Sequence, residues 1–188
     1  MMIRRWYGAV ASVVALLVAG AGTARIALEN ADRNEDERDR WGVVRERLSG
    51  YQEDPLAIST TGNGGFSLAI DEEDAELTYR LSYDALAGDV TQAHIHFGGR
   101  AQSGGISAFL CTNLGNGPAG TRPCPAPPAM LSGTIRPADV IGPTAQGIAP
   151  GEFGELVAAI RAGTAYVNVH SSRYPGGEIR GQLGRHWH

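Results

Sequence analysis

The feature that most constrains the fold of this chain is a series of strand-length apolar segments separated by glycine and proline. The 188 residues include 26 Gly and 10 Pro, a density that breaks the chain into many short pieces. Within these pieces apolar residues alternate with polar ones or run without interruption, which is the pattern of buried or half-buried strands. Eight strands are therefore predicted, at residues 44–51, 65–70, 76–83, 90–97, 105–112, 130–136, 164–171 and 177–183.

One helix is predicted among these strands. Residues 154–163 place Leu156, Val157 and Ile160 at helical spacing and end in Gly163. About eight strands with one short helix predict an all-β fold, a Greek-key β-sandwich or barrel, over residues 43–184. Residues 25–42 before this domain are dense in charges of both signs and are interpreted as a solvated spacer, and residues 185–188 as a tail.

The first 24 residues are interpreted as a targeting segment. Arg4 and Arg5 precede an apolar stretch at residues 7–21, and small residues follow up to Ala24. Cleavage after Ala21 or Ala24 would release a secreted or periplasmic protein. Without cleavage, the same segment of about 18 apolar residues would anchor the chain in a membrane with the domain outside. Both alternatives predict export.

The two cysteines, Cys111 and Cys124, bracket a loop rich in glycine and proline. In an exported protein they meet an oxidising compartment, where a disulfide is the expected state. Their spacing fits no common zinc pattern, so a structural disulfide is favoured over a pair of metal ligands.

Composition and missing motifs exclude several functions. All 16 basic residues are arginine, which rules out Schiff-base chemistry and Walker-type lysines. The net charge of −4, without a basic stripe, argues against a nucleic-acid partner. No Gly-x-Ser-x-Gly, His-Glu-x-x-His or Cys-x-x-Cys motif supports a hydrolase. The sequence favours binding over catalysis and leaves enzymatic activity open.

Three of the predicted strands carry one apolar face and one unusually polar face. Side chains alternate between the faces of a strand, so residues two apart lie on the same side. Long polar side chains that recur in this way indicate a shared polar site if the strands are neighbours. The polar faces consist of His94 and His96 in the first strand, of Tyr166, Asn168 and His170 in the second, and of Glu178, Arg180 and Gln182 in the third.

Two interpretations of these polar faces are open. If the strands are adjacent, three imidazoles converge and can bind copper or zinc, with a fourth position left for another ligand. Asn168 or Glu178 would then accept hydrogen bonds from the far ring nitrogens. Alternatively, Glu178 and Arg180 form an ion pair, and the histidines complete a metal-free polar network by hydrogen bonds. The metal ligands of the first interpretation are His94, His96 and His170.

Two stretches of the sequence resemble a known domain family. "AHIHFGGRAQSGGISAFLC" and "AYVNVHSSRYPGGEIRGQL" resemble the two signature blocks of the CHRD (chordin-type) domain, and the resemblance extends over roughly residues 44–183. Ser171 stands where the family pattern has Thr. The resemblance implies an exported all-β domain, found in microbial proteins as well as in chordin. Chordin's antagonism of growth factors is not carried over, because similarity of fold does not transfer function.

A second resemblance, to copper/zinc superoxide dismutase, rests on the His-x-His strand and the disulfide. The dismutase pattern needs further histidines and an aspartate for its second metal. Of the five histidines, only His94, His96 and His170 lie outside the C-terminal tail, so this resemblance is compatible with a mononuclear copper site.

The sequence thus leaves two functions. The first is an exported CHRD-like domain that binds one copper or zinc ion through three histidines. The second is a metal-free cell-surface interaction or adhesion module that contacts an unknown protein partner through its loops. In both, the membrane is contacted only through the N-terminal segment if that segment is retained.

Overall fold

The computed structural model describes residues 43–184. The predicted targeting segment at 1–24, the spacer at 25–42 and the tail at 185–188 lie outside the described residues. No helix within the described part of the chain is long and apolar enough to cross a membrane.

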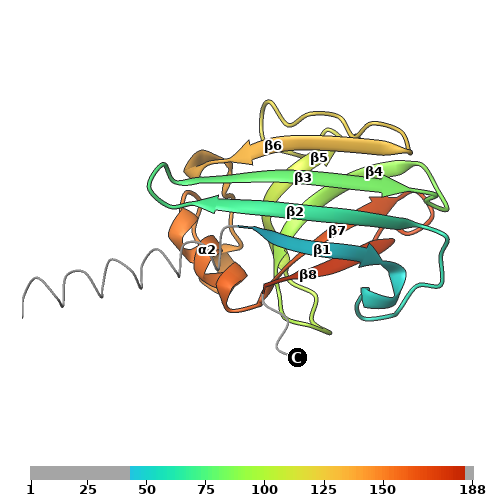
Figure 1. Ribbon diagram of the computed structural model, residues 1–188, viewed down its shortest axis with the longest axis horizontal. Helices are drawn as coiled ribbons and strands as arrows, with labels where there is room; N and C mark the ends of the chain where they lie inside the picture. Colours follow the sequence, from blue (N-terminus) through green and yellow to red (C-terminus); the bar gives the residue numbers. More distant parts are fainter. Residues whose placement is uncertain (1–42, 185–188) are drawn as a thin grey trace, which may run out of the picture. The chain divides into compact units, whose positions relative to one another are not determined.

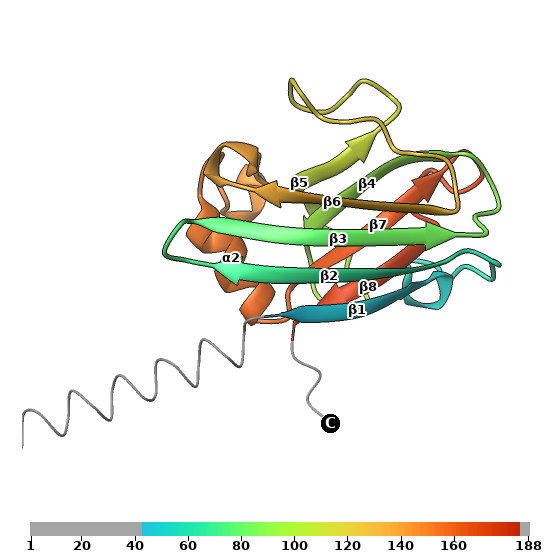
Figure 2. The ribbon, with the colours of Figure 1, turned by 45° about the horizontal axis from the view of Figure 1, so that its top comes forward.

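Eight antiparallel strands form one strongly curved, nearly closed sheet, as the sequence predicts. Their order across the sheet is β5-β4-β7-β8-β1-β2-β3-β6. Figure 1 and Figure 2 show the two halves of this sheet as two layers, with β6, β3, β2 and β1 facing β5, β4, β7 and β8. The strands are β1 (Val44–Ser49), β2 (Asn63–Asp71), β3 (Glu76–Asp84), β4 (Val90–Phe97), β5 (Gly105–Thr112), β6 (Ala129–Ile135), β7 (Ala165–Ser171) and β8 (Ile179–Leu183).

The first strand ends two residues earlier than its apolar pattern suggests. Instead of continuing to Tyr51, the chain forms the short 3-10 helix η1 (Gly50–Gln52). The carbonyl of Gly50 accepts hydrogen bonds from the amides of both Glu53 and Ile58, which turns the chain out of the sheet. A side chain at Gly50 would lie 2.2 Å from the Ile58 carbonyl oxygen, so this turn requires glycine. The turn places η1 beside β8.

The hydrophobic core lies between the two layers. Ile95, Val167 and Val169 from one layer and Leu77 and Leu81 from the other have no exposed surface. Burial of each such side chain contributes about 1.5–3 kcal/mol. This pattern fixes the orientation of β4 and β7, because the residues between these apolar positions must face away from the core.

The single α-helix of the described residues confirms the predicted one. Helix α2 (Phe153–Arg161) follows the 3-10 helices η2 (Pro137–Asp139) and η3 (Thr144–Gln146). Leu156, Val157 and Ile160, the residues at helical spacing, are buried. The helix lies at one end of the two layers (Figure 1).

The predicted disulfide between Cys111 and Cys124 is present. It joins Cys111 near the end of β5 to Cys124 in the connection from β5 to β6, which runs between the two outermost strands of the sheet order. Asn113 supports the same loop, since its side chain donates to the Cys124 carbonyl and accepts from the Cys124 amide. The disulfide therefore ties together a loop that joins the two edges of the sheet.

Replacing both cysteines with serine should lower the free energy of unfolding by about 3 kcal/mol, because the cross-link closes a loop of about 14 residues. Urea denaturation at neutral pH measures this difference. Reductant should shift the wild-type midpoint towards that of the double variant and leave the variant itself unchanged. An unshifted midpoint in both comparisons contradicts a stabilising role for the disulfide.

Candidate metal centre

The structure makes the histidine strands neighbours, which the sequence could not establish. Strand β4 pairs with β7, and β7 pairs with β8, all antiparallel. In this register His94 lies opposite Asn168, His96 opposite Tyr166, and Gln92 opposite His170. The three polar faces therefore merge into one surface on the side of the sheet that faces away from the core.

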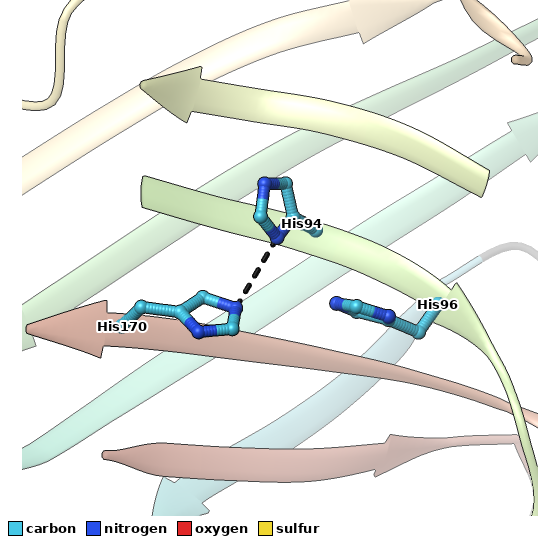
Figure 3. Close-up of side chains that lie close together, drawn as sticks. All are labelled: His94, His96 and His170. Atoms are coloured by element: carbon cyan, nitrogen blue, oxygen red, sulfur yellow. Dashed lines mark hydrogen bonds between the residues drawn. The ribbon is translucent and has the colours of Figure 1, made fainter. Parts of the chain in front are cut away.

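The three imidazoles converge on this surface. His94 and His96 extend from β4 towards His170 on β7 (Figure 3). Nδ1 of His94 lies 3.2 Å from Nε2 of His170, and one nitrogen from each of the three rings lies within 4.8 Å of the others. Two nitrogens bound to one tetrahedral zinc ion at 2.0–2.1 Å are about 3.4 Å apart. His94 and His170 are thus already at ligand spacing, and His96 needs only a small side-chain adjustment.

Two loops bury the histidines although these project away from the core. The loop at 98–104 supplies the Gly104 carbonyl, which lies 2.9 Å from Nδ1 of His96. The loop at 172–178 supplies the Pro175 carbonyl, 2.9 Å from Nδ1 of His170. A carbonyl only accepts, so each Nδ1 carries the proton and each Nε2 keeps its lone pair.

The carbonyls of Gly104 and Pro175 accept from Nδ1 of His96 and His170, and Asn168 interacts with the His96 side chain and favours its protonated form. Each carbonyl binds Nδ1, the ring nitrogen nearer the backbone, and leaves Nε2, the outer ring nitrogen, for another partner.

Burial keeps the imidazoles uncharged. It lowers the pKa of His94 to about 2, helped by the nearby His170 and His96 rings. Burial also lowers the pKa of His96 to about 4, with the Gly104 carbonyl acting in the opposite direction. The pKa of His170 is lowered by burial as well, and the Pro175 carbonyl opposes the shift. All three rings are neutral at neutral pH, which is the protonation state that metal binding requires.

Several buried acceptor atoms around this cluster lack a hydrogen-bond partner. They are Nε2 of His94, Nε2 of His96, Oδ1 of Asn168 and Oε1 of Glu53. The Asn168 side chain interacts with His96 and raises its pKa, and it also hydrogen-bonds to Glu53. These atoms therefore belong to one region. An unsatisfied buried acceptor costs about 1–3 kcal/mol, and a cation held by the cluster would satisfy Nε2 of His96.

Arg180 holds the loop at 98–104 in place. Its guanidinium donates to the carbonyls of Gly99 and Gln102 at 2.8 and 3.1 Å. It also lies 3.5 Å from the centre of the Tyr166 ring, and Tyr166 stacks on His96 with ring centres 4.8 Å apart. Arg180 therefore supports His96 in two ways, through the stacked tyrosine and through the loop that carries the Gly104 carbonyl.

Glu178 lies in a different network. Its Oε1 accepts from the Thr60 hydroxyl at 2.6 Å and from the Ala87 amide at 2.7 Å, which fastens two loops to the start of β8. Within the described residues, no ion pair joins Glu178 to Arg180, and no hydrogen bond joins it to a histidine. The ion pair of the metal-free interpretation is therefore not formed.

Glu53 is the residue of this site that sequence reasoning missed. It follows η1 in a segment without strand or helix periodicity, so no pattern marks it. Burial raises the pKa of Glu53 to about 7, while Arg180 and a hydrogen bond from Asn168 act in the opposite direction. The same segment is fastened over the site by Ser103, whose hydroxyl donates to the Asp54 carboxylate at 2.7 Å.

The sequence profile of the CHRD domain matches residues 44–183. The chain belongs to the CHRD family. The match spans all eight strands and includes the three histidines of this CHRD domain. No curated protein and no solved structure matches the chain. The family and the disulfide both fit an extracellular, oxidising setting.

In the metal-free protein, the buried histidines should make the stability of the domain fall with acidification from pH 6.5 to pH 4. The unfolded chain takes up protons near pH 6.5, whereas folded His94 and His96 do not until about pH 2 and pH 4. Each depressed histidine therefore removes up to about 1.4 kcal/mol per pH unit in this window. Urea denaturation at pH 7, 6, 5 and 4.5 measures the slope.

Glu53 should change the stability of the domain with pH in the direction opposite to that of the histidines. Its folded pKa of about 7 lies above its ordinary value of 4.5, so its contribution to stability falls as the pH rises between those values. Glu53→Gln should therefore steepen the acid-side loss of stability between pH 6.5 and 4.5. A free energy of unfolding that is equal or higher at pH 5 than at pH 7 in this variant contradicts the assignment of neutral, buried histidines.

Proposed function

We propose that this CHRD domain binds one copper or zinc ion through His94, His96 and His170. The observation that carries the proposal is the convergence of three buried, neutral imidazoles. Two of them, His96 and His170, have Nδ1 bonded to a backbone carbonyl, which leaves a lone pair on Nε2. In metal sites of this kind, the bond at the far ring nitrogen fixes the tautomer and the orientation of the ligand.

The donor set fits copper and zinc. Both ions bind imidazole nitrogen, and three protein ligands leave a fourth position for a further ligand. Both cysteines are occupied in the disulfide, and no carboxylate of the described residues belongs to the cluster. The imidazoles alone would hold the ion, with Tyr166 and Arg180 supporting His96.

A specific observation also favours a metal-free alternative. The contacts of the ring nitrogens with Gly104, Pro175 and between His94 and His170 are formed without an ion. In that case the histidines form a structural polar network, and the domain is an interaction or adhesion module with a protein partner at the cell surface. The unpartnered Nε2 atom of His96 weighs against it.

The setting of either function is outside the cytoplasm. We propose that the N-terminal segment exports the protein, which then acts in the periplasm, as a secreted protein or anchored with its domain outside. The disulfide at Cys111 and Cys124 supports this location.

Metal content of the full chain, produced by export and purified without an affinity tag, tests the metal proposal. Inductively coupled plasma mass spectrometry should find about one copper or zinc ion per chain. His96→Ala should lose it, because two imidazoles remain. The matched control is the double variant His186→Ala/His188→Ala, which removes the two histidines of the tail and should retain the ion.

A folded wild-type protein that takes up no copper or zinc contradicts the proposal and leaves the metal-free alternative. Retention of one ion per chain in a triple variant of His94, His96 and His170 contradicts it equally. Far-ultraviolet circular dichroism of each variant distinguishes loss of ligands from loss of the fold.

A further inference from the structure

The histidine cluster carries no negative charge. Its members are three imidazoles, and no aspartate, glutamate or cysteine of the described residues joins them at ligand distance. The rings are neutral, so a bound ion keeps its whole charge inside the site. This inference rests on the proposed metal binding.

A buried positive charge lies one residue away from this cluster. Arg180 is buried on β8, on the other side of β7 from His96, and both contact the Tyr166 ring. The guanidinium therefore places a positive charge one aromatic ring away from His96. It repels a bound cation in proportion to the charge of that cation.

The acids near this region do not join the cluster. Glu53 reaches the site through Asn168, Asp54 acts on Arg180, and neither carboxylate lies at ligand distance from the histidines. Asn168 itself is neutral and presents an unpartnered Oδ1. The described surroundings of the cluster thus provide weak neutralisation for a divalent ion.

The cluster is also poorly solvated. His94 has no exposed surface, and its ring packs edge-on against Phe109 with ring centres 4.4 Å apart. In a continuum description, the cost of moving an ion out of water grows with the square of its charge, so a divalent ion costs about four times as much as a monovalent ion of equal size.

We propose that the three-histidine site selects monovalent copper, Cu(I), over zinc and other divalent ions. Three imidazole nitrogens complete a trigonal set for Cu(I), whereas a tetrahedral zinc ion must add a fourth ligand. The selectivity comes from a neutral donor set, a poorly solvated pocket and the Arg180 cation behind Tyr166.

Competition titrations on the full wild-type chain test this selectivity. Cu(I) is measured anaerobically in ascorbate against bathocuproine disulfonate, and zinc is measured against a chromophoric zinc chelator. The dissociation constant for Cu(I) should be at least 100-fold lower than that for zinc. Zinc binding of equal or greater affinity overturns the selectivity and leaves the metal site intact. Binding of neither ion overturns the metal site itself.

A variant with an added negative charge tests the electrostatic basis of the proposed selectivity. Asn168→Asp adds a negative charge in almost the same volume, at a position paired with His94 on one side and Arg180 on the other. The affinity for zinc should rise at least tenfold relative to that for Cu(I). The control, Asn63→Asp, adds the same charge at the exposed start of β2 and should leave the ratio unchanged.

A folded Asn168→Asp variant with an unchanged affinity ratio overturns the electrostatic explanation. If this variant does not fold, the wild-type ratio of Cu(I) to zinc affinity still decides the proposal, because that measurement needs no substitution.

Discussion

The pairing of β4 with β7 is the interaction on which the whole site depends. It places His94 and His96 beside His170, although 76 residues separate His94 from His170 along the chain. The register is strongly specified, since Ile95, Val167 and Val169 must face the core. A slip of one residue would turn these apolar side chains outwards and the histidines inwards. The same alternation that builds the core therefore also gathers the imidazoles on the opposite face.

The site is completed by loops rather than by further strands. Residues 98–104 and 172–178 cross the polar face, bury it and bring two carbonyls to Nδ1 of His96 and of His170. Arg180 and Gln182 of β8 hold the first of these loops, since Arg180 binds the carbonyls of Gly99 and Gln102, and Gln182 donates to that of Gly98. The polar residues of β8 thus act on the loop, and through it on His96. This explains why three neighbouring strands, and not two, carry long polar side chains.

Much of the fold was predictable because it follows from local periodicity. Alternation identified all eight strands, the spacing of Leu156, Val157 and Ile160 identified the helix, and export favoured the disulfide. The shared face of His94 and His96 follows from the geometry of a single strand. That these residues meet His170 depends on a pairing between distant segments, which no local pattern determines. The alternation of side chains indicates only that the three histidines can converge if their strands are neighbours.

The residues around the histidines were harder to infer, because they act through loops. Backbone carbonyls such as those of Gly104 and Pro175 have no side-chain signature, and Glu53 lies in a segment without periodicity. Glu178, in contrast, was noticed in the sequence, but its partners differ from the expected one. Its position beside Arg180 in the sequence suggested an ion pair, yet the chain turns just before β8 and directs its carboxylate to Thr60 and Ala87. Sequence neighbours on one strand face need not be partners when one of them lies at the strand end.

The central claim is that the fold holds His96 and His170 in the tautomers that a metal ion needs, before any ion is bound. Long-range proton–nitrogen correlation spectra of the ¹⁵N-labelled, metal-free protein at neutral pH test this most directly. The account predicts that His96 and His170 are neutral, protonated at Nδ1 and unprotonated at Nε2. On addition of one equivalent of metal, Nδ1 should keep its proton and the resonance of Nε2 should shift. Rings protonated at Nε2, or charged imidazolium rings, would contradict the account.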